Sequence, residues 1–411
     1  MCTIIVPVPE KHSCVLLSGN PSEDHLMFSS TCSEKAPRLT SNTITVSVSQ
    51  LVRMAAAFII TVTISIGSVA ACGFDLVKPE RSSIDWIVDA EKLVIARPRA
   101  DNAFAYGVSE LLVGSTSDIE LPGLVSSTVR RQLALNLEDG ILFAHVSGID
   151  DGIAGSGWRI VAQVDNVFRP VLNTALAHRK EWRAGYEQSR QDFVDGLQGN
   201  SDPNIRALVI SEFDKMPYER LRTMDIRIPP QELLKELWTK QGYPYQAIRV
   251  LLLGLSDDYA AREEVHAFID RAEDWDWANN LGAFSAALVE LDGAKGAQKL
   301  ADRLLLDPSQ PLQKLEEVIM AFAAINKLAE PDVQTAIGLA ISDFVALRPG
   351  AGEIVARQFA AVSDWSQAAT LQTLVRQRSI SGLTGVLTVS VYLAQAREAN
   401  LSAGVGGQPD G

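Results

Sequence analysis

Residues 202–213 read DPNIRALVISEF, and this stretch shows the pattern that decides the larger part of the fold. Bulky apolar residues recur there, and just beyond, at the spacing of one helix face: Ile205, Leu208, Val209, Phe213 and Met216. Asp202 suits the N-cap, because its carboxylate can accept free amide hydrogens of the first turn, and Pro203 fits that turn. The sequence therefore predicts an amphipathic helix that begins at Asp202-Pro203.

The same apolar stripe returns further along the chain. Its clearest copies are Ala297, Leu300, Ala301 and Leu304; Leu315, Val318, Ile319 and Phe322; and Ile337, Ala340, Ile341 and Phe344. Prolines and short breaks divide the region into helix pairs near 202–241, 244–273, 277–307, 311–348 and 351–377, whose starts are 33 to 42 residues apart. This spacing predicts an α-solenoid of helix pairs over residues 201–398.

The stretch DPNIRALVISEF, with Arg206 early in the helix, resembles the first helix of a HEAT-type repeat. The resemblance implies stacked helix pairs over about 200 residues, and an irregular helical domain is the alternative. Residues 382–396 (GLTGVLTVSVYLAQA) are apolar nearly all round. Because they are short and contain polar residues, we interpret them as a buried closing helix rather than a membrane span. Residues 399–411 are predicted to be a flexible tail.

Residues from about 84 to 166 follow a period-two pattern instead. Leu93 and Ile95 alternate with Val94 and Ala96, and turn signals separate this run from later ones. Roughly five strands in about 85 residues predict a small β barrel or sandwich over residues 72–166. A helical connector over 167–200 follows, so the predicted fold class is multidomain, β then α.

The run FAYGVSELLVG, residues 104–114, follows a strand that ends in Ala96-Arg97. This order resembles the opening strands of netrin and metalloproteinase-inhibitor modules, which are OB-like barrels. The likeness covers about 30 residues, and the stretch lacks the disulfides that staple those modules. It implies an alternative function, regulation or inhibition of an extracytoplasmic protease through the exposed N-terminal edge of the β module.

Residues 54–71 (MAAAFIITVTISIGSVAA) form an uncharged stretch that follows Arg53. A positive flank, an apolar run and a small-residue exit are typical of a secretory signal peptide. We interpret residues 1–53 as a non-native or disordered leader, because such signals normally begin a chain. The alternative is an uncleaved 54–71 helix that anchors the protein in the inner membrane.

Val69-Ala70-Ala71-Cys72, at the exit of this segment, resembles the bacterial lipobox. The resemblance implies that Cys72 is lipidated and becomes the first residue of the mature chain. Cys72 is also the only cysteine from residue 72 onward, so it cannot form an intramolecular disulfide there. We expect a periplasmic or outer-membrane-anchored protein, with plain secretion after Ala70 or Ala71 as the other possibility.

Charge and motifs exclude several functions. The net charge of −13 argues against a nucleic-acid partner, because phosphate binding needs a basic surface. His145, His178 and His266 lie far apart in the sequence, and no zinc, nucleophile-elbow or phosphate-loop motif is present. The sequence therefore predicts no catalytic residue, no cofactor and no metal. Asp150-Asp151-Gly152 is interpreted as a turn rather than a calcium loop.

The segment Glu273-Asp274-Trp275-Asp276-Trp277 combines carboxylates with aromatic rings, the residue types that bind and hydrolyse sugars. It also falls where two predicted helices meet. We interpret Asp276 as a helix cap and Trp277 as packing between repeats.

These patterns favour a non-enzymatic protein-interaction scaffold of the cell envelope, with a protein partner and a lipid anchor at Cys72. Protease regulation through the β module is the alternative, and an unrecognised hydrolase is a third possibility that a cleft with carboxylates or a Ser/His pair would support.

The lipid anchor predicts the behaviour of Cys72→Ser. Diacylglycerol attachment needs the thiol, so wild type should partition into detergent, whereas the variant should accumulate uncleaved or be released in soluble form. Mass spectrometry of the mature wild-type N-terminus is the measurement. An unmodified thiol at Cys72, or a chain that begins at Gly73, would replace lipidation by plain secretion.

Overall fold

The computed structural model describes residues 81–115, 119–148, 157–185, 187–276, 278–380 and 382–405, without side chains for 402–405. All of them belong to one compact unit of the chain. The predicted leader, signal segment and Cys72 lie outside the described residues, as do Asp150-Asp151-Gly152 and Trp277.

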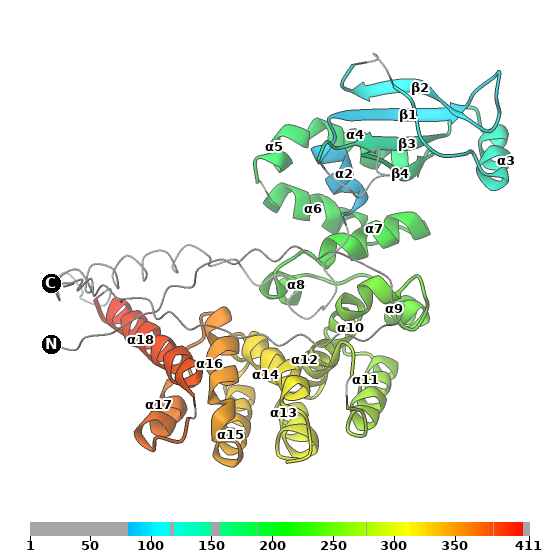
Figure 1. Ribbon diagram of the computed structural model, residues 1–411. Helices are drawn as coiled ribbons and strands as arrows, with labels where there is room; N and C mark the ends of the chain where they lie inside the picture. The colour runs from blue at the N-terminus through cyan, green and yellow to red at the C-terminus, as the bar shows by residue number, and fades with distance from the viewer. Residues whose placement is uncertain are drawn as a thin grey trace, which may run out of the picture. The chain divides into compact units, whose positions relative to one another are not determined.

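The first part of the described chain is a four-stranded antiparallel sheet with the strand order β2-β1-β3-β4 (Figure 1). Its elements are α2 (Ser83–Asp89), β1 (Lys92–Pro98), β2 (Tyr106–Val113), α3 (Ser127–Leu135), β3 (Gly140–His145) and β4 (Trp158–Val164). In this part of the chain β2 and β4 are the edge strands and do not pair with each other. The sequence predicted roughly five strands in a barrel or sandwich, whereas the described residues form one open sheet and two helices.

The inner strands β1 and β3 are buried on both faces, whereas β2 and β4 carry exposed residues. Leu93 and Ile95 point into the main core with α2, while Val94 and Ala96 belong to a second, smaller core. Strand β3 alternates in the same way against β1, to which it pairs. The small core is closed by Leu133 of α3 and contains Tyr106 and Phe143, so helices cover both faces of the sheet.

Helices make up the rest of the described chain (Figure 1). The connector is α4 (Phe168–Ala177), α5 (Arg179–Arg183) and α6 (Glu187–Leu197). The helices that follow are α7 (Pro203–Phe213), α8 (Tyr218–Thr223), α9 (Pro230–Leu237), η3 (Tyr243–Tyr245), α10 (Gln246–Gly254), α11 (Tyr259–Ala272), α12 (Leu281–Asp292), α13 (Ala294–Leu300), η4 (Ala301–Leu305), α14 (Leu312–Asn326), α15 (Pro331–Leu347), η5 (Pro349–Ala351), α16 (Gly352–Ala361), α17 (Ala368–Arg376) and α18 (Leu383–Val405).

The predicted helical stripes are confirmed. Asp202 caps α7 by accepting from the amides of Asn204 and Ile205, with Pro203 in the first turn. Every apolar residue of the stripe in this helix, and of the three later copies, is buried. The helices that carry these stripes therefore turn their apolar faces into one core.

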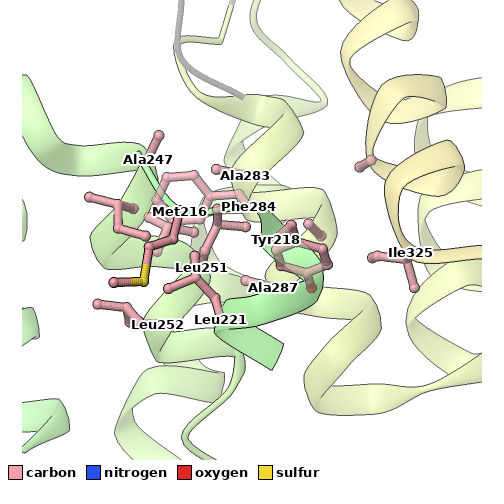
Figure 2. Packing of buried hydrophobic residues seen from close by; sticks show 14 of the residues in the cluster. Met216, Tyr218, Leu221, Ala247, Leu251, Leu252, Ala283, Phe284, Ala287 and Ile325 are labelled. Carbon is pink, nitrogen blue, oxygen red and sulfur yellow. The ribbon is translucent and has the colours of Figure 1, made fainter. Parts of the chain in front are cut away.

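Successive pairs pack through their first helices. Contacts join α10 to α12, α12 to α14, α14 to α16 and α16 to α18, and the second helices α13 and α15 also touch. Gly254 permits the closest of these approaches, because a Cβ on it would lie 2.6 Å from the Cα of Ala287. Met216, Leu221, Leu251 and Phe284 pack in the shared core, as do the other residues labelled in Figure 2.

Helix α18 has two different faces. Its buried residues, Val389, Tyr392, Leu393 and Ala396, pack toward the body of the protein, whereas Leu383, Leu387 and Val391 are exposed. The sequence had suggested a helix buried nearly all round. The helix also continues through Val405, so residues 399–405, expected in the tail, are helical. Among the described residues, no helix is both long and apolar enough to cross a membrane.

An ion-pair network holds α2, the helix before the sheet, against α6 and α7. The Arg190 guanidinium lies 2.5 Å from an Asp85 oxygen and 2.7 Å from a Glu212 oxygen, and the Lys215 ammonium contacts both carboxylates. Ser82, the N-cap of α2, donates to Glu212, which is only 4% exposed. Two carboxylates and two cations thus neutralise each other in a largely dry site.

Asp85 gives this network a pH signature. Burial alone would raise its pKa, but Lys215 and Arg190 lower the pKa to about 2 from an ordinary value of 3.8. The folded pKa lies below the unfolded one, so the stabilisation is complete above about pH 4 and is lost as pH falls through about 2.

Asp85→Asn should therefore lower the free energy of unfolding at pH 7 by about 2 kcal/mol, and its difference from wild type should shrink toward pH 2. Urea unfolding at several pH values measures this. The control is Asp101→Asn, which removes an exposed ion pair with Arg99 and should change stability little. An Asp85→Asn effect that is the same at pH 7 and pH 2 would contradict the account.

Candidate functional site

A pocket of about 260 Å³ opens where α9, η3, α11 and the turn before α12 meet. Its lining residues carry no formal charge and come from four segments of the chain: Leu237, Trp238, Thr239, Tyr243, Gln246, Phe268, Trp275, Ala278 and Asn279. We refer to this site as the aromatic pocket. Its volume suits one large side chain or a similar chemical group.

Aromatic rings form the floor and the rim of the pocket. Phe268 and Phe284 stack in the core, and the Trp238 ring lies nearly parallel to them with centroid distances of 6.1 and 6.0 Å. Trp275 meets Phe268 edge-on at 5.7 Å. Trp238, Tyr243 and Trp275 remain 54%, 53% and 41% exposed. Three large aromatic side chains around one opening offer a partner much contact area with little side-chain entropy to lose.

Hydrogen bonds fix the back wall of the pocket. Gln246 is buried; its amide donates to the carbonyl of Leu237 at 3.0 Å, and its oxygen accepts from Asn280 at 2.7 Å. Asn280 itself has a left-handed backbone, with φ of 59°, at the residue before α12. The indole N–H of Trp238 donates to Glu264 at 3.0 Å. These bonds hold the end of α9, the start of α10 and the start of α12 in one arrangement.

Lys314 of α14 holds the segment that carries Trp275. The side chain is 1% exposed, and its ammonium donates to the carbonyls of Ala272 and Trp275 at 2.5 and 2.6 Å and to the Gln310 side chain at 2.5 Å. A cation at the carboxyl end of α11 satisfies carbonyls that the helix leaves free. Burial lowers the pKa of Lys314, while nearby carboxylates, Asp276 first among them, raise it.

The sequence interpretation of Asp276 as a helix cap is wrong. Helix α12 begins at Leu281, Asn280 precedes it, and no side chain caps it. Asp274 and Asp276 are exposed on either side of Trp275, and Trp275 itself lines the pocket. The sequence shows the carboxylates and aromatic rings of segment 273–277. It does not show that Trp275 shares a pocket with Trp238 and Tyr243, because these residues lie more than 30 positions earlier and no local pattern links them to Trp275.

A larger pocket of about 480 Å³ lies beside α8, α12 and the end of α14. The least exposed carboxylate of its lining, Glu290, accepts from the Tyr218 hydroxyl at 2.7 Å and from Arg222 at 2.7 Å. Arg222 also donates to the carbonyl of Leu328. Burial, together with the Glu290 carboxylate, raises the pKa of Tyr218 well above its ordinary value. The polar groups here satisfy one another and join neighbouring helices.

The three histidines lie in separate surroundings. His145 ends β3 beside the Trp158 ring, and His178 contacts Glu181 at 2.8 Å. His266 lies between Asp292, at 2.6 Å, and Lys299, at 2.9 Å. Within the described part of the chain, no group of three or more His, Cys, Asp or Glu side chains is arranged to hold a metal ion.

In comparisons with known proteins, the chain matches no family model, no curated protein and no solved structure.

Lys314→Met should test how the Trp275 segment is held. Methionine fills a similar volume but removes the ammonium that donates to the carbonyls of Ala272 and Trp275. The Ala272 carbonyl keeps the Trp275 amide at 3.3 Å, whereas the Trp275 carbonyl loses the Lys314 donor, at a cost of about 1–3 kcal/mol. We expect a clear fall in the free energy of unfolding in urea and a red shift of tryptophan emission before global unfolding. Lys240→Met, at an exposed position near the same pocket, is the control. Equal stability of the two variants would contradict the assigned role.

Proposed function

We propose that this chain is a non-enzymatic protein-interaction scaffold of the cell envelope. The observation that carries the proposal is the aromatic pocket, where Trp238, Tyr243 and Trp275 stay about half exposed and the lining residues carry no formal charge. Interfaces concentrate their binding energy in a few aromatic and arginine side chains set in such pockets. The partner is a protein that inserts one projecting side chain between these rings.

The helix packing supports a scaffold role. We assign the helices from α7 to α18 to a HEAT-like solenoid, on the basis of the predicted 33 to 42 residue spacing and the contacts between the first helices of successive pairs. Stacked units of this kind build an extended binding surface. The assignment is an analogy of architecture and does not by itself identify the partner.

The pocket gives little support to hydrolysis. The lining of the aromatic pocket contains no carboxylate, histidine or serine that could act as acid, base or nucleophile. The larger pocket does hold the carboxylates of Glu219, Asp257 and Glu290, but each of them is paired with a cation, Lys327, Arg262 and Arg222 respectively. The protease-regulator alternative needs a free N-terminal edge on the β module. Residues 83–89 instead form α2, whose Ile84, Trp86 and Ile87 are buried in the main core. We therefore prefer the scaffold function to both alternatives.

The proposed subcellular location comes from the sequence. The 54–71 segment would direct export, and a lipid anchor at Cys72 would hold the protein on the periplasmic face of a membrane or at the outer membrane. A membrane-tethered scaffold meets its partner at raised local concentration, so a single-residue pocket of modest affinity can suffice.

Site-specific photo-crosslinking tests the pocket as the partner site. A photoreactive phenylalanine analogue at Tyr243 should capture a discrete partner in living cells, and the same analogue at the exposed Leu339 of α15 is the matched control. Trp275→Ala should reduce the crosslink at Tyr243 by about tenfold, since loss of an anchoring aromatic costs 2 kcal/mol or more. A crosslink that is equally strong in Trp275→Ala would overturn the assignment of this pocket.

A further inference from the structure

We propose that the group the aromatic pocket takes is a guanidinium, the end of an arginine side chain in a basic segment of the partner. This inference rests on the proposed function, because it names the chemistry of the side chain that enters the same pocket. Three observations carry it: the faces of the rings, the exposed carboxylates beside them, and the rigidity of the walls.

The rim of the pocket is built from the rings that bind cations best. A guanidinium or ammonium over the face of a tryptophan or tyrosine is attracted by the negative face of the ring. Trp238 adds to this effect, because its indole N–H donates to the Glu264 carboxylate, which makes the ring more electron-rich. A planar guanidinium also stacks on an indole, which an ammonium cannot do.

The charges around the rim favour a cation. Glu236, Glu264 and Glu273 are paired with Arg249, Arg271 and Arg303. Asp274 and Asp276, which flank Trp275, are exposed and form no ion pair with any described residue. Lys240 is the one exposed cation on the adjoining turn, between Thr239 and Tyr243, that likewise has no such pair among the described residues. The buried Lys314 ammonium also acts on Asp276 and Asp274 but donates to backbone carbonyls, so on the exposed rim two carboxylates face the single ammonium of Lys240, in a chain whose net charge is −13.

The walls are fixed before any ligand arrives. Gln246 and Asn280 lock the back of the pocket, and Lys314 ties the backbone of the Trp275 segment to α14. A preformed aromatic site avoids the entropy of ordering its own rings on binding. The fixed walls select a side chain by its shape, and the exposed carboxylates at the rim then favour a charged side chain over a neutral one of equal shape.

The test uses the folded chain and blocked tripeptides, acetyl-Gly-X-Gly-amide, with X as arginine, citrulline or leucine. Citrulline matches the shape of arginine but is neutral, so it separates charge from fit. Isothermal titration at low and high salt should show arginine binding about tenfold more tightly than citrulline or leucine, with the preference weakened by salt.

Two sets of variants complete the experiment. Trp275→Leu and Tyr243→Leu should each weaken the arginine peptide about tenfold. Asp274→Asn combined with Asp276→Asn should remove most of the salt dependence, while Asp257→Asn, at an exposed position that does not line this pocket, should change nothing. Circular dichroism confirms that each variant remains folded.

Two results would overturn the cation assignment. One is that the citrulline or leucine peptide binds as tightly as the arginine peptide. The other is that no binding of the arginine peptide is detected at a peptide concentration of about 20 mM. The photo-crosslinking experiment then separates the two proposals. A Tyr243 crosslink that still depends on Trp275 would leave the scaffold function standing with a partner side chain of another kind, whereas loss of both results would remove the pocket from the function altogether.

Discussion

Helix α2 depends on charged contacts at both of its ends, and the connection between the sheet and the helices depends on α2. At its amino end, Asp85 and Ser82 meet Arg190, Glu212 and Lys215. At its carboxyl end, Arg179 and Arg183 of α5 donate to the last carbonyls of the helix. A helix of seven residues is too short to be stable alone, so these contacts and the burial of Ile84, Trp86 and Ile87 must hold it.

The same kind of contact recurs along the chain: a cationic side chain of one element donates to backbone carbonyls at the carboxyl end of a helix in another part of the fold. Arg97 of β1 donates to Leu133 at the end of α3, and Lys314 of α14 to Ala272 at the end of α11. Arg222 donates to Leu328 beyond α14 in the same way. Each cation adds a donor for a carbonyl at a helix end, and so couples the end of one helix to the position of a neighbour. Removing one such cation should therefore disturb the junction as well as the ion pair.

The sequence predicted the parts of the fold that local pattern controls. The stripe of α7, its Asp202 cap and the two-faced alternation of β1 depend on residues within a few positions of each other, and all three are confirmed. Helix α2 was not predicted, because IDWIV reads equally well as a strand and the partners that stabilise the helix lie 89 to 130 residues away. The sequence pointed to the residue types around Trp275 but not to the role of Trp275 in a pocket, because the pocket also needs Trp238 and Tyr243, which lie more than 30 residues earlier in the chain. Interactions over such separations leave no periodic signal in a single sequence.

The position of the aromatic pocket follows from how helix pairs join. Where α9 ends and α11 turns back toward α12, the backbone must leave helical geometry, so side chains there are not needed to fill the space between parallel helix faces. Trp238 and Trp275 both lie at such turns, just after α9 and α11. Trp238 stacks by one face on Phe268 and Phe284 of the core and Trp275 meets Phe268 at a steep angle, while both tryptophans stay partly exposed. The stacked rings thus supply a rigid floor, while the turns supply side chains that the packing between helices does not need, so a substitution there can change binding without disturbing that packing.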